Sequence, residues 1–314
     1  MKKYSLALIL LIVLIIASSC GSDSKEDVSE DAFPYTFTDA LGNEVTVKSL
    51  DSVVILYGSF ADAWINGGGS LTGTTKDAIE ERGLALGDKV KIVGTVKEPN
   101  LEEIIALNPT LVIMSADIES QQKLGKSFEQ MGIPYAYMRI DVFDDYLDFL
   151  KLATKLNDRN DLYVSNGLDI KKRIDEILNK VPQDKKVKIL FLRAFSSGAK
   201  AKTFDNFTGI MLDELGTENI AAKYPSLLKE LSIEAIVKED PDYIFVTTMG
   251  DEDKAIEALR EGIGSNPVWQ SLTAIKNDKL IVLPKDLFHY KPNARWAESY
   301  EYLAKILYPE VFAQ

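Results

Sequence analysis

The side chains best suited to binding a ligand are concentrated near the end of the sequence. Aromatic and basic residues gather there around a proline, within nine residues: Phe288, His289, Tyr290, Lys291, Arg295 and Trp296. Aromatic rings stack on planar groups, and basic side chains pair with carboxylate or catecholate oxygens. We therefore interpret this segment as one wall of a ligand cleft, whereas Trp296 taken alone is predicted to pack in the core.

Two more candidates stand at the ends of apolar runs. The run 53–57 ends on the phenol of Tyr57, and the run 187–193 ends on the guanidinium of Arg193. A guanidinium that ends an apolar strand is costly to bury without a partner. Arg193 therefore requires either an acidic residue of the protein or an anionic ligand, and the sequence leaves both open.

The elements that must position these residues are short apolar runs that alternate with helical patterns, which predicts an α/β fold. The runs indicate parallel strands covered on both faces: 53–57, 91–93, 111–114, 135–138, 187–193, 243–247 and 280–283. Ligands of such folds lie outside the carboxyl ends of the strands. Residues that follow the strands are therefore further candidates for binding: Ser59, Phe60, Trp64, Ser115, Arg139, Phe195 and Thr248.

The two halves of the chain resemble each other locally. Residues 101–113 align with residues 233–245 at an offset of 132, and each segment reads as a short helix, a proline turn and a buried strand. The strands at 53–57 and 189–193 align at an offset of 136. Similar offsets indicate a duplicated α/β lobe, with chance similarity of two strand–helix units as the alternative.

A helical region separates the halves. Residues 144–180 contain no proline, and their apolar residues recur at helical spacing. We predict two helices with a break near residues 157–160. The second, from about residue 161 to about residue 181, would be roughly 30 Å long at about 1.5 Å per residue. Such a helix can join two lobes, or it can cover one side of a single domain.

The N-terminus has the features of an export signal. Lys2 and Lys3 precede an apolar run, residues 6–16, that is too short to span a membrane. Small residues follow, and then Cys20, the only cysteine. This order resembles a bacterial lipoprotein signal, in which the cysteine is lipidated, although Ala17 replaces the usual Leu, Val or Ile. An ordinary cleaved signal is the alternative, and residues 20–34 are polar enough to form a flexible tether.

Composition argues against several classes of function. Lys and Arg total 36 against 48 Asp and Glu, and a net charge of −12 disfavours nucleic-acid binding. One histidine and one cysteine permit neither a disulfide framework nor a multi-histidine site for a free metal ion. A hydrolase would have to use His289, and the chain has no Gly-x-Ser-x-Gly motif. A structural surface lipoprotein is the remaining alternative.

The segment 100–113 contains the pattern Leu-Glu-x-Ile-x-x-Leu-x-Pro-x-Leu-Val. Together with the lipoprotein signal, the two α/β halves and the connecting helix, it resembles the substrate-binding proteins of ABC importers for ferric siderophores, haem and cobalamin. The resemblance covers about residues 35–312. It implies two Rossmann-like lobes with mostly parallel sheets, joined by one long rigid α-helix (the class III periplasmic-binding-protein architecture). It also implies a ligand cleft between the lobes and no enzymatic activity.

In the family that the sequence resembles, a glutamate near the start of one helix in each lobe docks on arginines of the permease. The matching residues here are Glu102 and Glu234. Asn100 and Ser232 are good N-caps, so that each glutamate falls in a first helical turn. The simpler alternative is that both acids only complement the helix dipole.

The resemblance leaves three classes of ligand. A ferric siderophore ranks first, then cobalamin or another corrinoid, then haem. Only haem would require Tyr57 or His289 as a direct iron ligand, and no cofactor of the protein's own is expected. The predicted ligand-binding residues are Tyr57, Ser59, Phe60, Trp64, Ser115, Arg139, Arg193, Phe195, Thr248, Phe288, His289, Tyr290, Lys291 and Arg295.

The complete hypothesis divides the chain into five parts: a signal peptide (1–19), a tether (20–34), an N-terminal lobe (35–157), a connecting helix (158–182) and a C-terminal lobe (183–314). The protein is expected to be a monomer held outside the cytoplasm by a lipid on Cys20. Its expected partners are the chelate, the membrane, and an ABC permease dimer with its ATPase.

Overall fold

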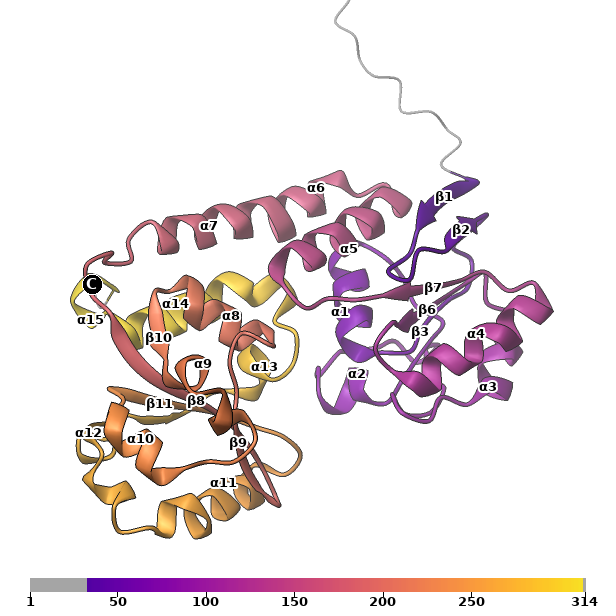
Figure 1. Ribbon diagram of the computed structural model, residues 1–314. Helices are drawn as coiled ribbons and strands as arrows, with labels where there is room; N and C mark the ends of the chain where they lie inside the picture. Colours follow the sequence, from indigo (N-terminus) through magenta and orange to yellow (C-terminus); the bar gives the residue numbers. More distant parts are fainter. Residues whose placement is uncertain (1–32, 313–314) are drawn as a thin grey trace, which may run out of the picture. The chain divides into compact units, whose positions relative to one another are not determined.

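Two mostly parallel β-sheets dominate residues 33–312, the part of the chain that the computed structural model describes (Figure 1). The predicted signal peptide, Cys20 and most of the predicted tether lie outside the described residues. No helix among the described residues is both long and apolar enough to cross a membrane. The predicted α/β fold with two lobes is confirmed.

The sheet of the N-terminal half has five parallel strands in the order β5-β4-β3-β6-β7. A separate antiparallel pair, β1 and β2, precedes it in the chain. Every residue of β3 and β6 is buried, as their unbroken apolar runs predict. The strands are β1 (Tyr35–Thr38), β2 (Glu44–Val47), β3 (Val53–Ile55), β4 (Gly73–Thr74), β5 (Lys91–Ile92), β6 (Leu111–Ser115) and β7 (Tyr135–Met138).

The sheet of the C-terminal half has four parallel strands in the order β10-β8-β11-β12. A fifth strand, β9, returns antiparallel along the end of β8. This hairpin makes β8 two residues longer than the predicted run. The strands are β8 (Val187–Phe195), β9 (Gly198–Ala201), β10 (Thr217–Asn219), β11 (Tyr243–Thr248) and β12 (Leu280–Val282).

The central strand pairs of the two sheets have the same register. Val53 of β3 lies opposite Leu111 of β6, and Ile189 of β8 lies opposite Tyr243 of β11. The second pair is therefore the first pair shifted by the two offsets, 136 and 132, that the sequence shows. The internal similarity thus corresponds to equivalent positions in the two sheets.

Helices cover the sheets on both faces. In the N-terminal half they are α1 (Gly58–Asn66), α2 (Asp77–Glu80), α3 (Leu101–Ala106), α4 (Glu119–Met131) and α5 (Phe143–Leu156). In the C-terminal half they are α8 (Phe207–Glu214), α9 (Ile220–Lys223), α10 (Ile233–Glu239), α11 (Glu252–Glu261), α12 (Thr273–Lys276), α13 (Lys285–Phe288), α14 (Trp296–Leu307) and α15 (Pro309–Phe312). Short 3-10 turns are η2 (Pro225–Leu228), η3 (Ile263–Ser265), η4 (Trp269–Ser271) and η5 (Asn293–Arg295).

The connecting region between the halves breaks where the sequence predicts. After α5 the chain turns, and α6 (Asn160–Tyr163), the π-helical turn η1 (Val164–Leu168) and α7 (Asp169–Leu178) then follow without interruption. In η1, the Asn166 side chain donates a 2.8 Å hydrogen bond to the Asn66 carbonyl at the end of α1. The connecting helix formed by α6, η1 and α7 is therefore hydrogen-bonded to the N-terminal half at η1, partway along the connecting helix.

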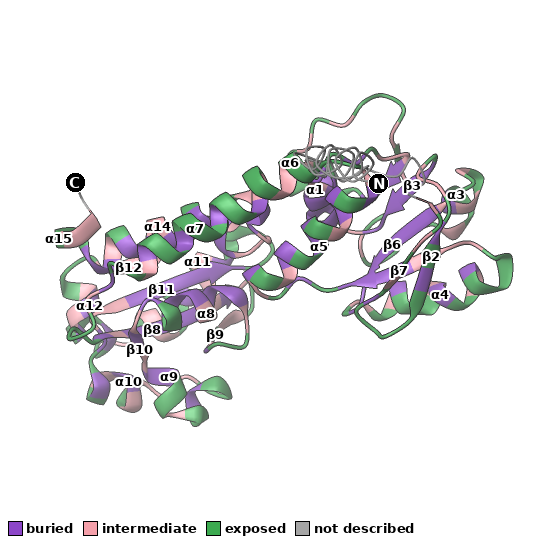
Figure 2. Cartoon of the chain, turned by 90° about the horizontal axis from the view of Figure 1, so that it is seen from above, coloured by how far each residue is buried: buried purple, intermediate pink, exposed green. Residues whose placement is uncertain are grey.

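One hydrophobic core extends through both halves. It includes Val53 and Ile55 of β3 and also Ile189 and Phe191 of β8. Between them, α7 packs on α14 and buries Ile174 and its neighbours, while the opposite side of α7 is exposed (Figure 2). Smaller clusters lie on the other face of each sheet. This common core holds the strand ends of the two halves in place.

Candidate ligand-binding site

Tyr57 and Arg193 occupy equivalent places at the carboxyl ends of the two central strands. Tyr57 follows β3 and occupies the N-cap position of α1, with extended backbone angles of −155° and 122°. Arg193 lies near the end of β8, opposite Thr247 of β11. Both side chains are partly buried. These are the edges of α/β sheets at which ligands bind.

The phenol of Tyr57 is neutral at physiological pH. Burial and the negative charges of Asp77 and Glu81 raise the pKa of Tyr57 to about 12. Asp77 is only 8% exposed, and its carboxylate accepts a 2.6 Å hydrogen bond from the backbone N–H of Gly58 at the start of α1. Burial raises the pKa of Asp77 as well. Tyr57 is consequently a hydrogen-bond donor and a poor phenolate ligand.

Four buried side-chain polar atoms in the C-terminal half have no hydrogen-bond partner among the described residues: Nε of Arg193, Nδ1 of His289, Oδ1 of Asn293 and Nε1 of Trp296. The first two belong to neighbouring groups near the strand ends. Burial lowers the pKa of Arg193, an effect that Asp205 partly offsets, and Asp205 is itself paired with Lys202. Burial, together with the positive charges of Arg193 and Lys285, lowers the pKa of His289 to about 4. His289 is therefore neutral at pH 7 beside a guanidinium that remains charged.

Tyr290 and Lys291 extend this group toward the N-terminal half. The Tyr290 ring meets that of His289 edge to face, with centroids 5.1 Å apart. Burial and the charge of Glu81 raise the pKa of Tyr290. The Nζ atom of Lys291 lies 3.3 Å from a carboxylate oxygen of Asp141, and its side chain is only 18% exposed. The charge of Lys291 is thus already paired.

The two remaining predicted arginines also have acidic partners within the protein. Arg295 lies 2.6 Å from Asp286 and 2.7 Å from Glu298. Arg139 donates a 2.9 Å hydrogen bond to Asp117. Both guanidiniums are substantially exposed, and exposed ion pairs contribute little to stability. Arg139 and Arg295 remain candidates for ligand contacts, but the charge of each is already paired with an acidic residue of the protein.

Three aromatic residues predicted to contact a ligand are instead core residues, and this corrects their assignment. Phe60, Trp64 and Phe288 are at most 1% exposed. Phe60 stacks with Phe149 at 5.7 Å, and Trp64 donates to the Ser70 carbonyl at 3.1 Å. Because a large aromatic surface is stabilising when buried, these side chains pack inward from the strand ends. Trp296 is also buried, so its predicted core position is confirmed.

The small predicted residues support the strand ends rather than expose polar groups. At most 3% of each residue is exposed for Ser59, Ser115 and Thr248. The Thr248 hydroxyl, for example, lies 3.2 Å from a carboxylate oxygen of Glu252 in the next helix. This burial corrects their assignment as ligand contacts. Phe195, at the end of β8, is partly exposed and remains a candidate.

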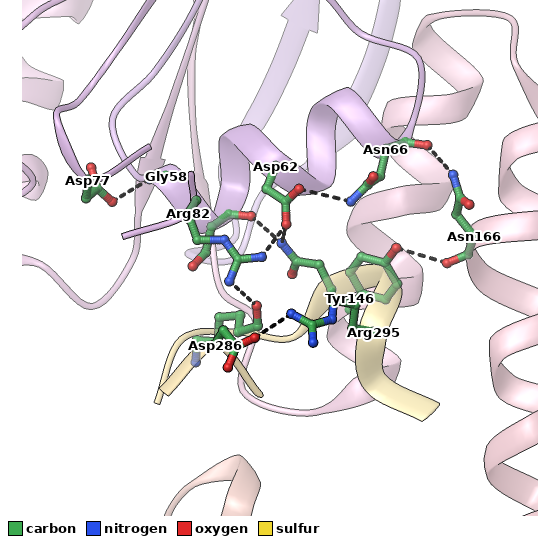
Figure 3. Close-up of polar contacts among 12 residues, drawn as sticks. Gly58, Asp62, Asn66, Asp77, Arg82, Tyr146, Asn166, Asp286 and Arg295 are labelled. Atoms are coloured by element: carbon green, nitrogen blue, oxygen red, sulfur yellow. Dashed lines mark hydrogen bonds and ion pairs between the residues drawn. The ribbon is translucent and has the colours of Figure 1, made fainter. Parts of the chain in front are cut away.

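Four polar residues close to this group are not identified by the sequence patterns: Asp62, Glu81, Arg82 and Asn293. Arg82 forms an ion pair with Asp62, and Asn293 donates a 2.8 Å hydrogen bond to the same carboxylate (Figure 3). Asp62 and Arg82 are 20 residues apart in the sequence, and Asn293 is more than 200 residues away. The local sequence signal for Asn293 is that it follows Pro292 at the start of η5, a pair of residues typical of a turn.

Glu102 and Glu234 stand at matching places on α3 and α10. The side chain of Asn100 caps α3 by accepting from the backbone N–H groups of Glu102 and Glu103 at 3.0 and 3.2 Å. The Ser232 hydroxyl caps α10 and also lies 2.9 Å from the carboxylate of Glu234. Glu102 and Glu234 are exposed. Each lobe therefore presents one carboxylate in the first turn of an equivalent helix.

These features define a two-lobed binding protein. Residues 53–287 match the family described as periplasmic binding protein, and the chain belongs to this family. The family comprises substrate-binding proteins and not enzymes, so a hydrolase based on His289 finds no support.

Particular relatives extend this result. The chain is 27% identical over 295 residues to the Fe(3+)-citrate-binding protein YfmC of Bacillus subtilis, with 91% of this chain and 90% of the relative covered. It is 25% identical over 327 residues to the uncharacterized ABC transporter substrate-binding lipoprotein YvrC of the same organism, with 100% of this chain and 99% of the relative covered. The crystal structure of Staphylococcus aureus SirA complexed with staphyloferrin B has the same fold, with a TM-score of 0.62, 21% identity, and 88% and 98% coverage.

Proposed function

We propose that this protein captures a ferric siderophore, or a related anionic iron chelate, between its two lobes and delivers it to the permease of an ABC importer. The observation that carries the proposal is that two of the buried atoms without partners, Nε of Arg193 and Nδ1 of His289, belong to neighbouring side chains beside the end of β8. Buried polar groups are nearly always hydrogen-bonded. An anionic chelate would supply the missing acceptor for the guanidinium, and a relative that binds Fe(3+)-citrate is consistent with this chemistry.

The chelate would bring its iron already coordinated. Among residues 33–312, no cluster of three or more His, Cys, Asp or Glu side chains could hold a metal ion. Aromatic surface from Tyr57, Phe195 and Tyr290 and the charges of Arg193 and Lys285 suit an aromatic or carboxylate chelate. Cobalamin, which is large and mostly neutral, would leave the charge of Arg193 unmatched.

Haem is the second candidate, and His289 is the observation that favours it. An imidazole whose pKa is lowered to about 4 is unprotonated at pH 7 and can coordinate iron. Tyr57 is a weaker candidate, because its pKa of about 12 opposes the phenolate form. A haem complex would therefore show histidine coordination, which visible spectroscopy distinguishes from coordination by tyrosinate.

Delivery to a permease assigns roles to residues outside the ligand site. We assign docking to Glu102 and Glu234, which are exposed at equivalent helix starts. We assign membrane anchoring to a lipid on Cys20, outside the cytoplasm, with residues 20–34 as the tether. Relatives that are named as lipoproteins support this anchoring. One copy of the chain, bearing one glutamate per lobe, would face a permease dimer.

Native mass spectrometry of the protein purified from its own host tests the proposal directly. The expected result is a bound species with the mass of an iron chelate, lost on denaturation. Calorimetric titration of the emptied protein with ferric citrate and a panel of ferric siderophores should then show saturable binding of at least one ferric chelate, and titration with cobalamin should show none. A bound corrinoid, or no saturable binding of any ferric chelate, would overturn the assignment, and binding of haem alone would favour the second candidate.

A further inference from the structure

A segment of the C-terminal half crosses to helix α1 of the N-terminal half. We call residues 289–293, which follow α13, the strap. The guanidinium of Arg82 donates a 2.8 Å hydrogen bond to the carbonyl oxygen of Lys291 in the strap. At the end of the strap, the side-chain amide of Asn293 donates to the carbonyl of Ser59 at 2.7 Å and to the carboxylate of Asp62 at 2.8 Å. The strap is therefore bonded to the N-terminal half at two points.

Asp62 joins the two points of attachment. Its carboxylate accepts from both Arg82 and Asn293, as Figure 3 shows around the labelled Asp62 and Arg82. The side chains of Arg82 and Asp62 are 10% and 17% exposed, and Asn293 is fully buried. Hydrogen bonds to charged groups in such surroundings are stronger than exposed ones, and removing one partner leaves the other buried and unpaired.

The position of Asn293 requires an asparagine. Its φ of 53° lies in the left-handed region, which asparagine tolerates better than most residues. Its Nδ2 atom faces two acceptors, the Ser59 carbonyl and Asp62. An aspartate of the same shape would place an acceptor against both of them. Nothing in the ligand site itself demands this residue, so its role lies in holding the strap.

The strap carries residues that the proposed function uses. His289 and Tyr290 belong to the strap. Tyr57 stands at the start of α1, the helix to which the strap is bonded. We propose that Arg82 and Asn293 are positioning residues of the ligand site, which hold the strap on α1 and so preset the spacing between Tyr57 and the His289–Tyr290 pair. The inference rests on the proposed function, since it assigns these two residues to the same site.

Preset spacing affects affinity because a preorganised site loses less conformational entropy when the ligand binds. In N293D, two attractive contacts become repulsive, and we expect ferric citrate to bind at least about tenfold more weakly. In R82K, the ammonium still neutralises Asp62 but the planar donor to Lys291 is lost, and we expect a loss of about threefold. The milder variant tests the inference if N293D does not fold.

The test combines calorimetric titration of ferric citrate with hydrogen exchange of the strap amides, in the full mature chain. The matched control is Y308F, which removes a buried 2.7 Å hydrogen bond to the Leu215 carbonyl, away from the strap. We expect both strap variants to exchange faster at residues 289–293 and to bind more weakly, and the control to do neither. A double variant, D62N with N293D, restores a donor facing a carboxylate and should recover part of the affinity.

Two outcomes would overturn the inference. One is wild-type affinity in both strap variants, and the other is unchanged exchange of the strap amides. Failure of the wild-type protein to bind ferric citrate would count against the proposed ligand instead, and the exchange measurement would then still decide whether Arg82 and Asn293 hold the strap.

Discussion

The ends of β3 and β8 occupy equivalent places, yet they differ in what they leave unpaired. After β3, helix α1 begins at once, and the buried carboxylate of Asp77 satisfies a backbone N–H at its start. After β8, the chain turns back as β9, and Arg193 is left with an unpartnered Nε. An anion at a helix start is stabilising, so the N-terminal half has filled that position with its own side chain. The C-terminal strand end instead has a guanidinium whose Nε has no partner, whereas at the N-terminal strand end the unpartnered charged-group atom is one oxygen of the Asp77 carboxylate.

This difference shows how two equivalent strand ends can contribute different chemical groups to one proposed site. The register of the central strands is the same in both halves, so the two strand ends offer equivalent positions for a side chain that contacts a ligand. In the proposed site, the N-terminal half supplies a neutral phenol, and the C-terminal half supplies the charge that selects an anionic ligand. The halves remain alike in the proposed docking residues, since each half presents one exposed glutamate in the first turn of an equivalent helix.

The largest expected effect is the loss of uptake when the glutamate that each half presents is replaced. Replacement of both Glu102 and Glu234 by alanine should abolish uptake of the labelled chelate by cells, because each lobe would lose its contact with the permease. The single variants should each reduce uptake to a similar degree. Binding by the purified double variant should stay within about twofold of wild type, since neither residue lies in the site.

The control for docking is Glu103→Ala, which removes a neighbouring exposed carboxylate from the same first turn. Uptake by this variant should equal that of wild type. Normal uptake by the double variant would remove the docking role, and a large effect of only one single variant would show that the two halves are unequal here too.

The next expected effect is a difference in binding loss between substitutions at the ends of β8 and β3. Arg193→Met should weaken binding of an anionic ferric chelate by about 1.5–3 kcal/mol, the range for hydrogen bonds to charged groups. Tyr57→Phe removes a neutral donor and should cost only about 0.5–1.5 kcal/mol. Calorimetry gives both values, and Arg159→Ala, which removes an exposed arginine that is paired with Asp161 outside the candidate site, serves as the control. Equal losses at Arg193 and Tyr57 would contradict the division of labour.

The last expected effect is the pH dependence of stability that His289 contributes in the C-terminal half. The pKa of His289 is lowered to about 4 in the folded protein, against about 6.5 when unfolded. Between these values the unfolded state binds more protons, so the contribution of His289 to stability is complete above pH 6.5 and is lost as the pH falls toward 4. It amounts to at most about 3 kcal/mol.

Urea denaturation at pH 7 and at pH 4.5 measures this contribution as the difference between wild type and His289→Gln. The difference should change with pH for His289→Gln and stay constant for Tyr57→Phe, because Tyr57 does not titrate in this range. A constant difference for both variants would show that His289 is not desolvated as described.

The sequence predicted the fold well because the fold depends on local patterns. The run 135–138 became β7 with the same bounds, and the helix break near residue 157 was placed correctly. The hairpin of β1 and β2 was missed because its residues alternate between buried or half-buried and exposed, and β4 because it has only two residues. Such segments lack the continuous apolar run on which the prediction relied.

The site could be predicted only in part. Arg193 could be singled out because a cation at the end of an apolar strand is unusual in any fold, and its contact with a ligand stays a prediction. The orientation of Phe60 and Phe288 depends on packing against distant residues, so the same local pattern led to a wrong assignment. Arg82 and Asn293 were missed for a related reason, because their partners lie on the other half of the chain.

The π-helical turn η1 has a consequence for the phase of the helix that follows it. A π turn contains one residue more than an α-helical turn, and each residue of an α-helix rotates the chain by about 100°. Gly167 lies in this turn, where a Cβ atom would come within 3.0 Å of Leu147. Deleting one residue there would restore regular α-helix and swing Ile170 and Ile174 about a quarter-turn away from α14. A single extra residue in the connector thus sets which side of α7 meets the core.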